Sequence, residues 1–381
     1  MSTRLRWLGL WMVMLLLSLA VTQCTSASAP ATSGAPSKSI APAPAASTAP
    51  SPAASSPAAS PKPLSMQKVS VAGIALGQQT PIWIAQEKGF FKQEGLEVQF
   101  VNTPTGREIM SALIGGSVQF GVPSITDPLN AIEQGAQLRT VFTLTTAGEL
   151  ALVIRKDVAA KLGITADMPA DTALRRVKGI KIGISSIGTG AHLQTSAVLK
   201  QRGVNTDTDV SFVPVGGGPA LLAAYQQKAI DAFAWVPPED LMAEHAGDTL
   251  VFWFNQLDEY KGLTYMTLTV TKQFIDEHTD VVQAFVRGAA QGWKYLMTDK
   301  EGAYQVFKTH VPYPDEWLQK ATFDTVYPNF QNGFWFSRAG FDKGVALANF
   351  GRKEPLKVTY EQFVDERFVN QAMQDLKIPR P

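Results

Sequence analysis

The sequence predicts an α/β protein of two similar halves, each holding a mainly parallel sheet flanked by helices. Three observations lead to this class. Short apolar runs with many β-branched residues alternate with helical segments along the chain. A polar loop rich in Gly, Ser, Thr or Pro follows most of the predicted strands. This succession occurs once before and once after about residue 150, and 381 residues suffice for two such units.

The first 23 residues have the layout of a signal peptide. Two arginines precede an almost uninterrupted apolar run from Trp7 to Val21. The run ends at Cys24, the only cysteine of the chain, in a segment similar to a bacterial lipobox, although Gln23 replaces the small residue usual before the cysteine. We therefore expect a lipid anchor at Cys24. An uncleaved membrane anchor and a secretory peptide cut elsewhere are the alternatives, and all three place the folded part outside the cytoplasmic membrane.

Residues 24–65 consist almost entirely of Ala, Pro, Ser and Thr. Such a segment cannot bury enough apolar surface to offset the entropy lost on ordering. Its prolines make it a semi-rigid spacer, which at roughly 3 Å per residue reaches on the order of 100 Å. We expect a disordered tether that lets the folded part move between capture and delivery. A cell-wall spacer is the alternative.

The first half, expected over residues 66–150, begins with the stretch Val69–Phe100. Its opening run of β-branched and apolar residues indicates a strand. A Gly-Gln-Gln loop leads to a helix that Thr80 can cap and Pro81 opens, because the N–H that proline lacks would have no partner in the first turn. A second strand is expected over Leu96–Val101, where apolar and polar residues alternate.

Two further helices and two further strands complete the first half. The helices are expected over Arg107–Ile114 and Pro128–Gln134, and the strands over Val118–Val122 and Leu138–Leu144. Parallel strands joined by helices end at one edge of the sheet, and in open α/β sheets ligands bind there. Each loop precedes a helix, so free backbone N–H groups and the positive end of the helix dipole should face the same cleft.

The second half, expected over residues 151–262, repeats this succession. Its strands are predicted at Ala151–Ile154, Ile180–Ser185, Val210–Val215, Ala229–Ala234 and Leu250–Phe254. Its helices are predicted to begin at Ala191, Pro219 and Glu239. Residues 263–381 open with a strand at Tyr265–Val270 and a long amphipathic helix over Phe274–Met297, and the remainder is mostly helical.

Three phrases of the chain carry a resemblance to a known family. They are Lys88–Val98 (KGFFKQEGLEV), Ala112–Ser124 and Val215–Ala232 (VGGGPALLAAYQQKAIDA). They resemble the substrate-binding proteins of ABC importers for nitrate, sulfonates, taurine and thiamine-pyrimidine precursors. The resemblance covers about Lys68 to Ile378. A generic α/β domain with a glycine-terminated helix is the alternative explanation of these phrases.

The resemblance implies a two-lobed, type II periplasmic-binding-protein-like fold, in which residues 263–381 return to the first lobe. The two crossing segments, near Thr145–Ile154 and Asn255–Tyr265, would form the hinge. The implied function is an extracytoplasmic solute-binding lipoprotein, held in the periplasm or on the outer face of the cytoplasmic membrane. It would capture a small molecule and deliver it to an ABC permease and its ATPase. We expect a monomer without a cofactor.

Ligand contacts are expected at the tips of the loops that follow the strands. The candidates are Gln78, Thr80, Thr105, Gly106, Ser124, Ser186, Thr189, Gly190, Gly217 and Trp235. Thr105 and Thr126 suit helix capping as well as ligand contact, whereas contact is favoured for Ser124. Trp235 suits either an aromatic wall of the cleft or a core position under Pro237-Pro238.

The sequence gives little support for catalysis, metal binding or nucleic-acid binding. The four histidines have no metal-ligand spacing, although His192 lies near a cleft loop, and no Gly-x-Ser-x-Gly motif is present. The formal charge is 34 − 33 = +1, which gives no basic field for nucleic acid. The resembled group includes fungal pyrimidine synthases with a cysteine-rich motif, which this chain lacks. A lipid-anchored sensor or adhesin is a further alternative.

Two classes of solute are compatible with the predicted loops. A small organic anion such as a sulfonate would use helix N-termini, hydroxyls and Arg107, and is the leading hypothesis. A pyrimidine, flavin or other aromatic heterocycle would use Trp83, Trp235, Asp127 and Glu239. The first loop lacks the Asn/His-rich motif of the pyrimidine binders, which favours the anion.

Overall fold

The computed structural model describes residues 66–146, 148, 150–311, 313 and 315–380. The chain divides into two units, residues 1–61 and 62–381, and every described residue belongs to the second. The predicted signal peptide, tether and lipid anchor at Cys24 lie outside the described residues. None of the described helices combines the length and apolar character that crossing a membrane requires.

The first sheet has the strand order β2-β1-β3-β10-β4. Its strands are β1 (Gln67–Gly73), β2 (Leu96–Asn102), β3 (Phe120–Gly121), β4 (Leu138–Thr146) and β10 (Thr264–Thr271). β1 pairs in parallel with β2 and β3, and β10 pairs antiparallel with β3 and β4. The other strands therefore run one way and β10 runs against them. The predicted strand Val118–Val122 shrinks to two residues, because only these pair with both neighbours.

The second sheet repeats this arrangement with the order β7-β6-β8-β5-β9. Its strands are β5 (Ala151–Ile154), β6 (Ile180–Ile184), β7 (Val210–Pro214), β8 (Ala232–Trp235) and β9 (Thr249–Trp253). β6 is parallel to β7 and β8, and β5 is antiparallel to β8 and β9. In each sheet the reversed strand is the first one formed after the chain arrives from the other sheet. The prediction of two mainly parallel sheets is confirmed.

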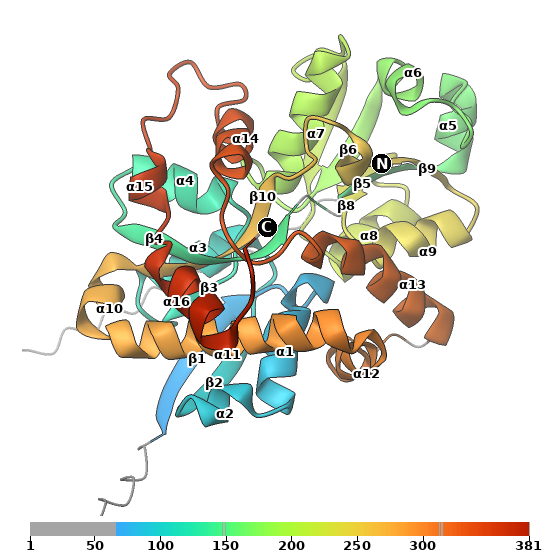
Figure 1. The fold of residues 1–381 in the computed structure, drawn as a ribbon. Coiled ribbons are helices and arrows are strands. Elements are labelled where there is room, and N and C mark those ends of the chain that lie inside the picture. Colours follow the sequence, from blue (N-terminus) through green and yellow to red (C-terminus); the bar gives the residue numbers. More distant parts are fainter. Residues whose placement is uncertain (1–65, 147, 149, 312, 314, 381) are drawn as a thin grey trace, which may run out of the picture. The chain divides into compact units, whose positions relative to one another are not determined.

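Helices flank both sheets (Figure 1). Around the first sheet lie α1 (Thr80–Glu87), α2 (Phe90–Gln93), α3 (Gly106–Ile114), α4 (Thr126–Glu133), α10 (Lys272–Glu277), α11 (Thr279–Thr298), α12 (Lys300–His310), α14 (Arg338–Ala348), α15 (Tyr360–Phe363) and α16 (Arg367–Leu376). Along the second lie α5 (Lys156–Leu162), α6 (Ala170–Arg175), α7 (Gly190–Gln201), α8 (Pro219–Gln226) and α9 (Glu239–His245), and α13 (Glu316–Val326) packs against α9. The orange and red C-terminal helices of Figure 1 thus lie mostly beside the blue and teal first sheet.

The predicted long helix over Phe274–Met297 is wrong in one respect, because it breaks into α10 and α11. The break falls at His278, whose backbone leaves the helical region with φ −139° and ψ 46°. The hydroxyl of Thr279 donates to the carbonyl of Ile275 at 2.7 Å. This side-chain bond supplies a partner for a carbonyl at the end of α10, next to the break.

Aromatic side chains join α11 to the first sheet. Phe285 lies between Phe91 and Phe120, with ring centroids 4.7 Å and 4.0 Å away. All three rings are fully buried. Trp83 is also buried, against Phe100 and His310, so it belongs to the core and not to the cleft loops. The hypothesis that Trp83 contacts a solute is therefore wrong, because the apolar face of α1 turns toward α11 and α12.

We expect Gly292→Ala to destabilise the protein by about 1 to 3 kcal/mol. A Cβ at Gly292 would lie 2.0 Å from the backbone oxygen of Pro81, so α1 and α11 would have to separate. Helix propensity alone predicts the opposite, a gain of about 1 kcal/mol. Urea unfolding would decide between the two effects. Thr298→Ala, an exposed position on the same helix, is the control, and a stabilised Gly292→Ala variant would contradict this packing.

Candidate functional site

A small cavity of about 60 Å³ lies where loops from both sheets meet. We call it the inner cavity. Its lining includes six of the residues predicted from the sequence: Gln78, Gly106, Ser124, Thr189, Gly190 and Trp235. The first turns of α3, α4 and α7 all border it, through residues such as Gly106, Asp127 and Gly190. Helix N-termini from both halves therefore do converge on one place, as the loop pattern predicts.

Four of the predicted residues do not line the inner cavity. Thr80 is buried as the first residue of α1, and its hydroxyl donates to the carbonyl of Gly77 at 2.6 Å, so it does not cap the helix from the N-cap position. Thr105 is the N-cap of α3, accepting from the backbone N–H of Glu108. Ser186 lies one residue beyond Ser185, which does line the cavity.

Gly217, the fourth of these, lies behind the cavity wall. A Cβ at this position would come within 2.5 Å of the Trp235 ring and 3.4 Å of the Pro104 carbonyl oxygen. Glycine therefore lets the loop after β7 approach both the indole and the loop after β2. Trp235 is buried and lines the inner cavity, and its indole Nε1 has no hydrogen-bond partner in the described structure. Of the two positions considered for Trp235, the structure favours the cleft wall.

Asp127 is the central polar group of the inner cavity. The hydroxyl of Ser124 donates to Asp127 Oδ2 at 3.0 Å, and the Oγ atoms of Ser124 and Thr126 are also 3.0 Å apart. A Cβ at Gly106 would lie 2.5 Å from Asp127 Oδ2, so only glycine leaves room for the carboxylate. Burial raises the pKa of Asp127 from 3.8 to about 6, against the opposing effects of Ser124 and Arg107. Sequence patterns indicated only that this acid lies near the cleft.

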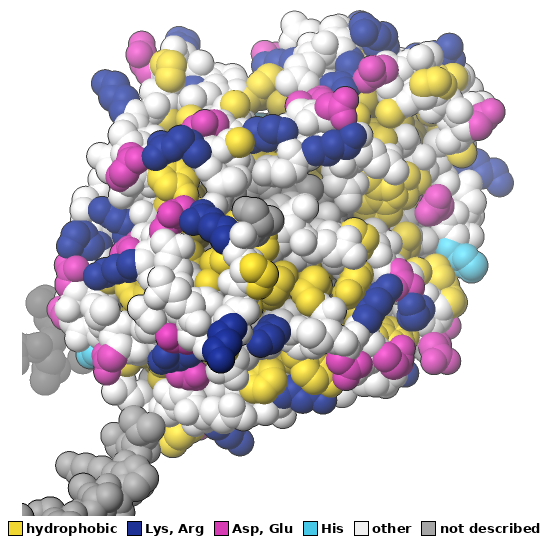
Figure 2. Space-filling model, in the orientation of Figure 1, with side chains coloured by type: hydrophobic (Ala, Val, Ile, Leu, Met, Phe, Trp, Pro, Cys, Tyr) yellow, Lys and Arg dark blue, Asp and Glu magenta, His cyan; other side chains and the backbone are white. Residues whose placement is uncertain are grey.

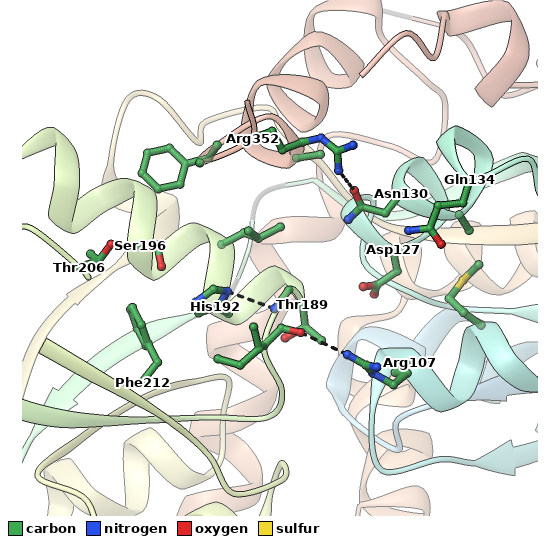
Figure 3. Close-up of a pocket in the computed structure, with 18 of the residues that line it drawn as sticks. Arg107, Asp127, Asn130, Gln134, Thr189, His192, Ser196, Thr206, Phe212 and Arg352 are labelled. Atoms are coloured by element: carbon green, nitrogen blue, oxygen red, sulfur yellow. Dashed lines mark hydrogen bonds between the residues drawn. The ribbon is translucent and has the colours of Figure 1, made fainter. Parts of the chain in front are cut away.

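A larger groove of about 1050 Å³ opens beside the inner cavity. We call it the outer groove. Asp127 and Thr189 line both spaces, so the two adjoin at these residues. Figure 3 shows the groove between α3 and α4 on one side and the loop that begins α7 on the other. Arg352 reaches in from the segment after α14 and donates to Asn130 Oδ1 at 3.0 Å.

Cationic side chains lie in the outer groove and not in the inner cavity. Arg107 is exposed there, and its Nη2 lies 3.5 Å from the carbonyl oxygen of Ile187 in the second half (Figure 3). Burial, with Lys200 nearby, lowers the pKa of His192, whose Nδ1 accepts from the backbone N–H of Gly188. Among the described residues that line the inner cavity, Asp127 is the only charged one.

Glu239, proposed from the sequence as a possible contact, does not line either space. Its side chain is buried at the start of α9, with Oε1 3.5 Å from where a Cβ on Gly218 would lie. Burial raises the pKa of Glu239 to about 7. The crossing segments supply lining residues that loop patterns did not indicate, Leu150 and Tyr265. Within the described residues, no group of three His, Cys, Asp or Glu side chains is placed to hold a metal ion.

The face shown in Figure 2 carries basic and acidic side chains interspersed with each other. No patch of a single sign dominates this face. This distribution agrees with the formal charge of +1. It gives this face no extended field to attract a polyanion such as nucleic acid.

Residues 77–303 match the model of a family described as NMT1/THI5 like. The chain is 26% identical over 257 residues to the taurine-binding periplasmic protein of Escherichia coli strain K12, covering 67% of this chain and 70% of that protein. It is 21% identical over 264 residues to the 4-amino-5-hydroxymethyl-2-methylpyrimidine phosphate synthase of Aspergillus parasiticus, covering 66% of this chain and 72% of that protein.

The fold is shared with solved structures. The alkanesulfonate-binding protein SsuA from Xanthomonas axonopodis pv. citri, bound to MOPS, matches with a TM-score of 0.62 at 18% identity, covering 78% of this chain and 98% of that chain. The nitrate-binding protein NrtA from Synechocystis PCC 6803 matches with a TM-score of 0.62 at 15% identity, covering 82% and 89% of the two chains. These matches confirm the predicted periplasmic-binding-protein fold.

Asp127→Asn should flatten the pH dependence of stability between about pH 4 and pH 7. The folded-state pKa of Asp127 is raised, so the folded protein binds more protons than the unfolded chain in this interval. Stability contributed by protonated Asp127 is fully present below pH 3.8 and is lost as the pH rises through about 6. Urea unfolding should show the wild type losing about 2 to 3 kcal/mol relative to Asp127→Asn over this range.

Asp207→Asn provides the matched control for this measurement. Asp207 is an exposed carboxylate of the outer groove, paired with Lys200 at 3.5 Å, and it does not line the inner cavity. This variant should keep the wild-type slope. Parallel curves for the wild type and Asp127→Asn would show that the Asp127 carboxyl is not desolvated.

Proposed function

Because the chain belongs to the NMT1/THI5-like family, we propose that it is the extracytoplasmic solute-binding protein of an ABC importer. It captures a small organic solute between its two sheets and delivers the solute to a permease and its ATPase. The observation that carries this proposal is the inner cavity, which is bordered by matching loops of the two halves and by three helix N-termini. Such a site suits closure of two lobes around a ligand.

A small organic anion, such as a sulfonate, is the leading class of solute. The taurine-binding relative supports it, because taurine carries a sulfonate. Arg107 supports it as well, since none of the carboxylates in the described structure lies within ion-pair distance of this guanidinium at the mouth of the cavity. Helix N-termini add a favourable potential for negative charge.

An aromatic heterocycle, such as a pyrimidine or flavin, is the second candidate. The specific observation in its favour is the lining of the inner cavity, where Trp235 and Tyr265 stand among mostly apolar side chains. The single charged group there, Asp127, is an acid, which suits an amino substituent better than an anion. The Aspergillus relative is named for a pyrimidine phosphate, which agrees with this class.

Solute binding is better supported than an enzyme of the synthase type. The only cysteine of the chain, Cys24, precedes the low-complexity segment, so the sequence 25–381 has no cysteine-rich motif. A lipid-anchored sensor that uses the same fold is a weaker candidate. Genes for a permease and an ATPase beside this gene would support import.

We expect Cys24→Ala to release the processed protein from the membrane. The apolar N-terminal run ending at the only cysteine motivates this expectation. Partitioning into detergent, followed by immunoblotting, would measure it. A cleaved Cys24→Ala product that stays in the detergent phase would rule out the lipid anchor.

A thermal-shift screen tests the binding function. The solutes are alkanesulfonates, carboxylates, nitrate, pyrimidines and flavins. A true ligand at about 100 times its Kd stabilises the folded protein by roughly 2.7 kcal/mol. For an anion, Arg107→Gln should weaken binding by about tenfold or more, because a charge-assisted hydrogen bond is lost.

Arg352→Gln is the control for this screen, because Arg352 lies in the same groove but already donates to Asn130. A shift with aromatic heterocycles alone would replace the anion with the second candidate. If no solute of any class raised the melting temperature, the binding function itself would be contradicted.

A further inference from the structure

We propose that Asp127 recognises an amino or ammonium group of the solute, so that the site selects aminated solutes over simple anions. This inference rests on the proposed solute-binding function and narrows its chemistry. The inner cavity presents an acidic side chain, whereas a plain sulfonate, carboxylate or nitrate would be expected to meet a cationic one.

The partners of Asp127 are too few for a carboxylate in this place. Ser124 supplies the hydrogen bonds that Asp127 accepts, including the 3.0 Å bond from its hydroxyl. No Lys, Arg or His of the described structure lies within ion-pair distance of Asp127, and Arg107 acts on it only from further away. A carboxylate accepts about four hydrogen bonds, so Asp127 keeps capacity for further donors.

Asp127 lies where a bound solute would be in contact with it. Its side chain lines both the inner cavity and the outer groove, and in Figure 3 it points into the space between α4 and the loop that carries Thr189. Gly106 keeps this position open, because any side chain there would displace the carboxylate. A solute in the inner cavity would therefore lie beside Asp127.

The desolvation and the negative charge of the Asp127 carboxylate determine which solute it favours. A partly desolvated carboxylate repels a second anion and gains most from N–H donors that replace its lost hydration. An ammonium group or an amino group on a heterocycle provides such donors. A simple anion provides none and would stand beside a like charge.

Trp235, from the second half, supplies a complementary group in the lining of the inner cavity. Its Nε1–H is a donor only, and it is unpaired in the described structure although the residue is buried. A solute with an amino group and a nearby acceptor could pair with Asp127 of the first half and Trp235 of the second. Residues of both halves would then hold one molecule, which favours aminosulfonates and amino-substituted heterocycles.

Two matched pairs of probes test this inference by isothermal titration calorimetry. Taurine is compared with ethanesulfonate, and 4-aminopyrimidine with pyrimidine, so that each pair differs only by the amino group. We expect the aminated member of at least one pair to bind the wild type about tenfold or more tightly than its partner. Asp127→Asn should reduce that ratio to near one, whereas Asp207→Asn in the outer groove should preserve it.

The outcomes separate this inference from the function on which it rests. If ethanesulfonate and pyrimidine both bound the wild type as tightly as their aminated partners, solute binding would stand and the role of Asp127 would be overturned. A ratio unchanged in a folded Asp127→Asn protein would overturn it equally. The wild-type ratio needs no variant, so misfolding of Asp127→Asn would leave the test intact. If all four probes and the wider solute screen gave no binding, the proposed function would fail and this inference with it.

Discussion

The architecture depends on the two reversed strands, β5 and β10. Each is formed directly after the chain passes from one sheet to the other, and each pairs antiparallel with two strands of the sheet it joins. Because these strands run against their neighbours, they begin at the edge where the other strands end. Leu150, just before β5, and Tyr265, in β10, therefore line the same cavity as the loops after β1, β3, β6 and β8. The same feature, an antiparallel strand that begins at the cavity edge of its sheet, thus occurs in both halves and contributes lining residues to the site.

Basic side chains and the central acidic side chain of the site lie in different spaces. Arg107 lies in the outer groove, together with Lys200 and Arg352, whereas Asp127 faces the inner cavity among apolar and hydroxyl-bearing side chains. In the groove Lys200 pairs with Asp207 and Arg352 donates to Asn130, so Arg107 is the cation there that we expect an anionic solute to engage. A molecule with both an anionic end and an amino end matches Arg107 and Asp127 together better than an ion of either sign alone. The sulfonate and heterocycle hypotheses each describe one part of this arrangement.

Much of the fold was predictable because local rules determine it. β-branched runs identify strands, and Gly, Ser and Thr identify the loops between strand and helix, so Gln78, Ser124 and Thr189 were found from the sequence. Shifts of one or a few residues were not predictable from these patterns. Ser185 lines the cavity and Ser186 does not, and both lie beyond the end of β6, where strand alternation no longer assigns side chains to a face.

Tertiary contacts decide the remaining features. Trp83 enters the core because α12 supplies His310 as a stacking partner more than two hundred residues along the chain. Asp127 becomes central because Gly106, on another helix, leaves space for its carboxylate. The break at His278 interrupts a segment that the amphipathic pattern treats as one helix. None of these relations has a signature in a single stretch of sequence.

The most direct test of this account is a crystal structure of the protein with the solute that raises its melting temperature most. The account predicts that the solute lies in the inner cavity, within hydrogen-bonding distance of Asp127 and in contact with the Trp235 indole. A solute bound only in the outer groove, or elsewhere on the surface, would contradict the claim that the converging loops of the two sheets form the binding site.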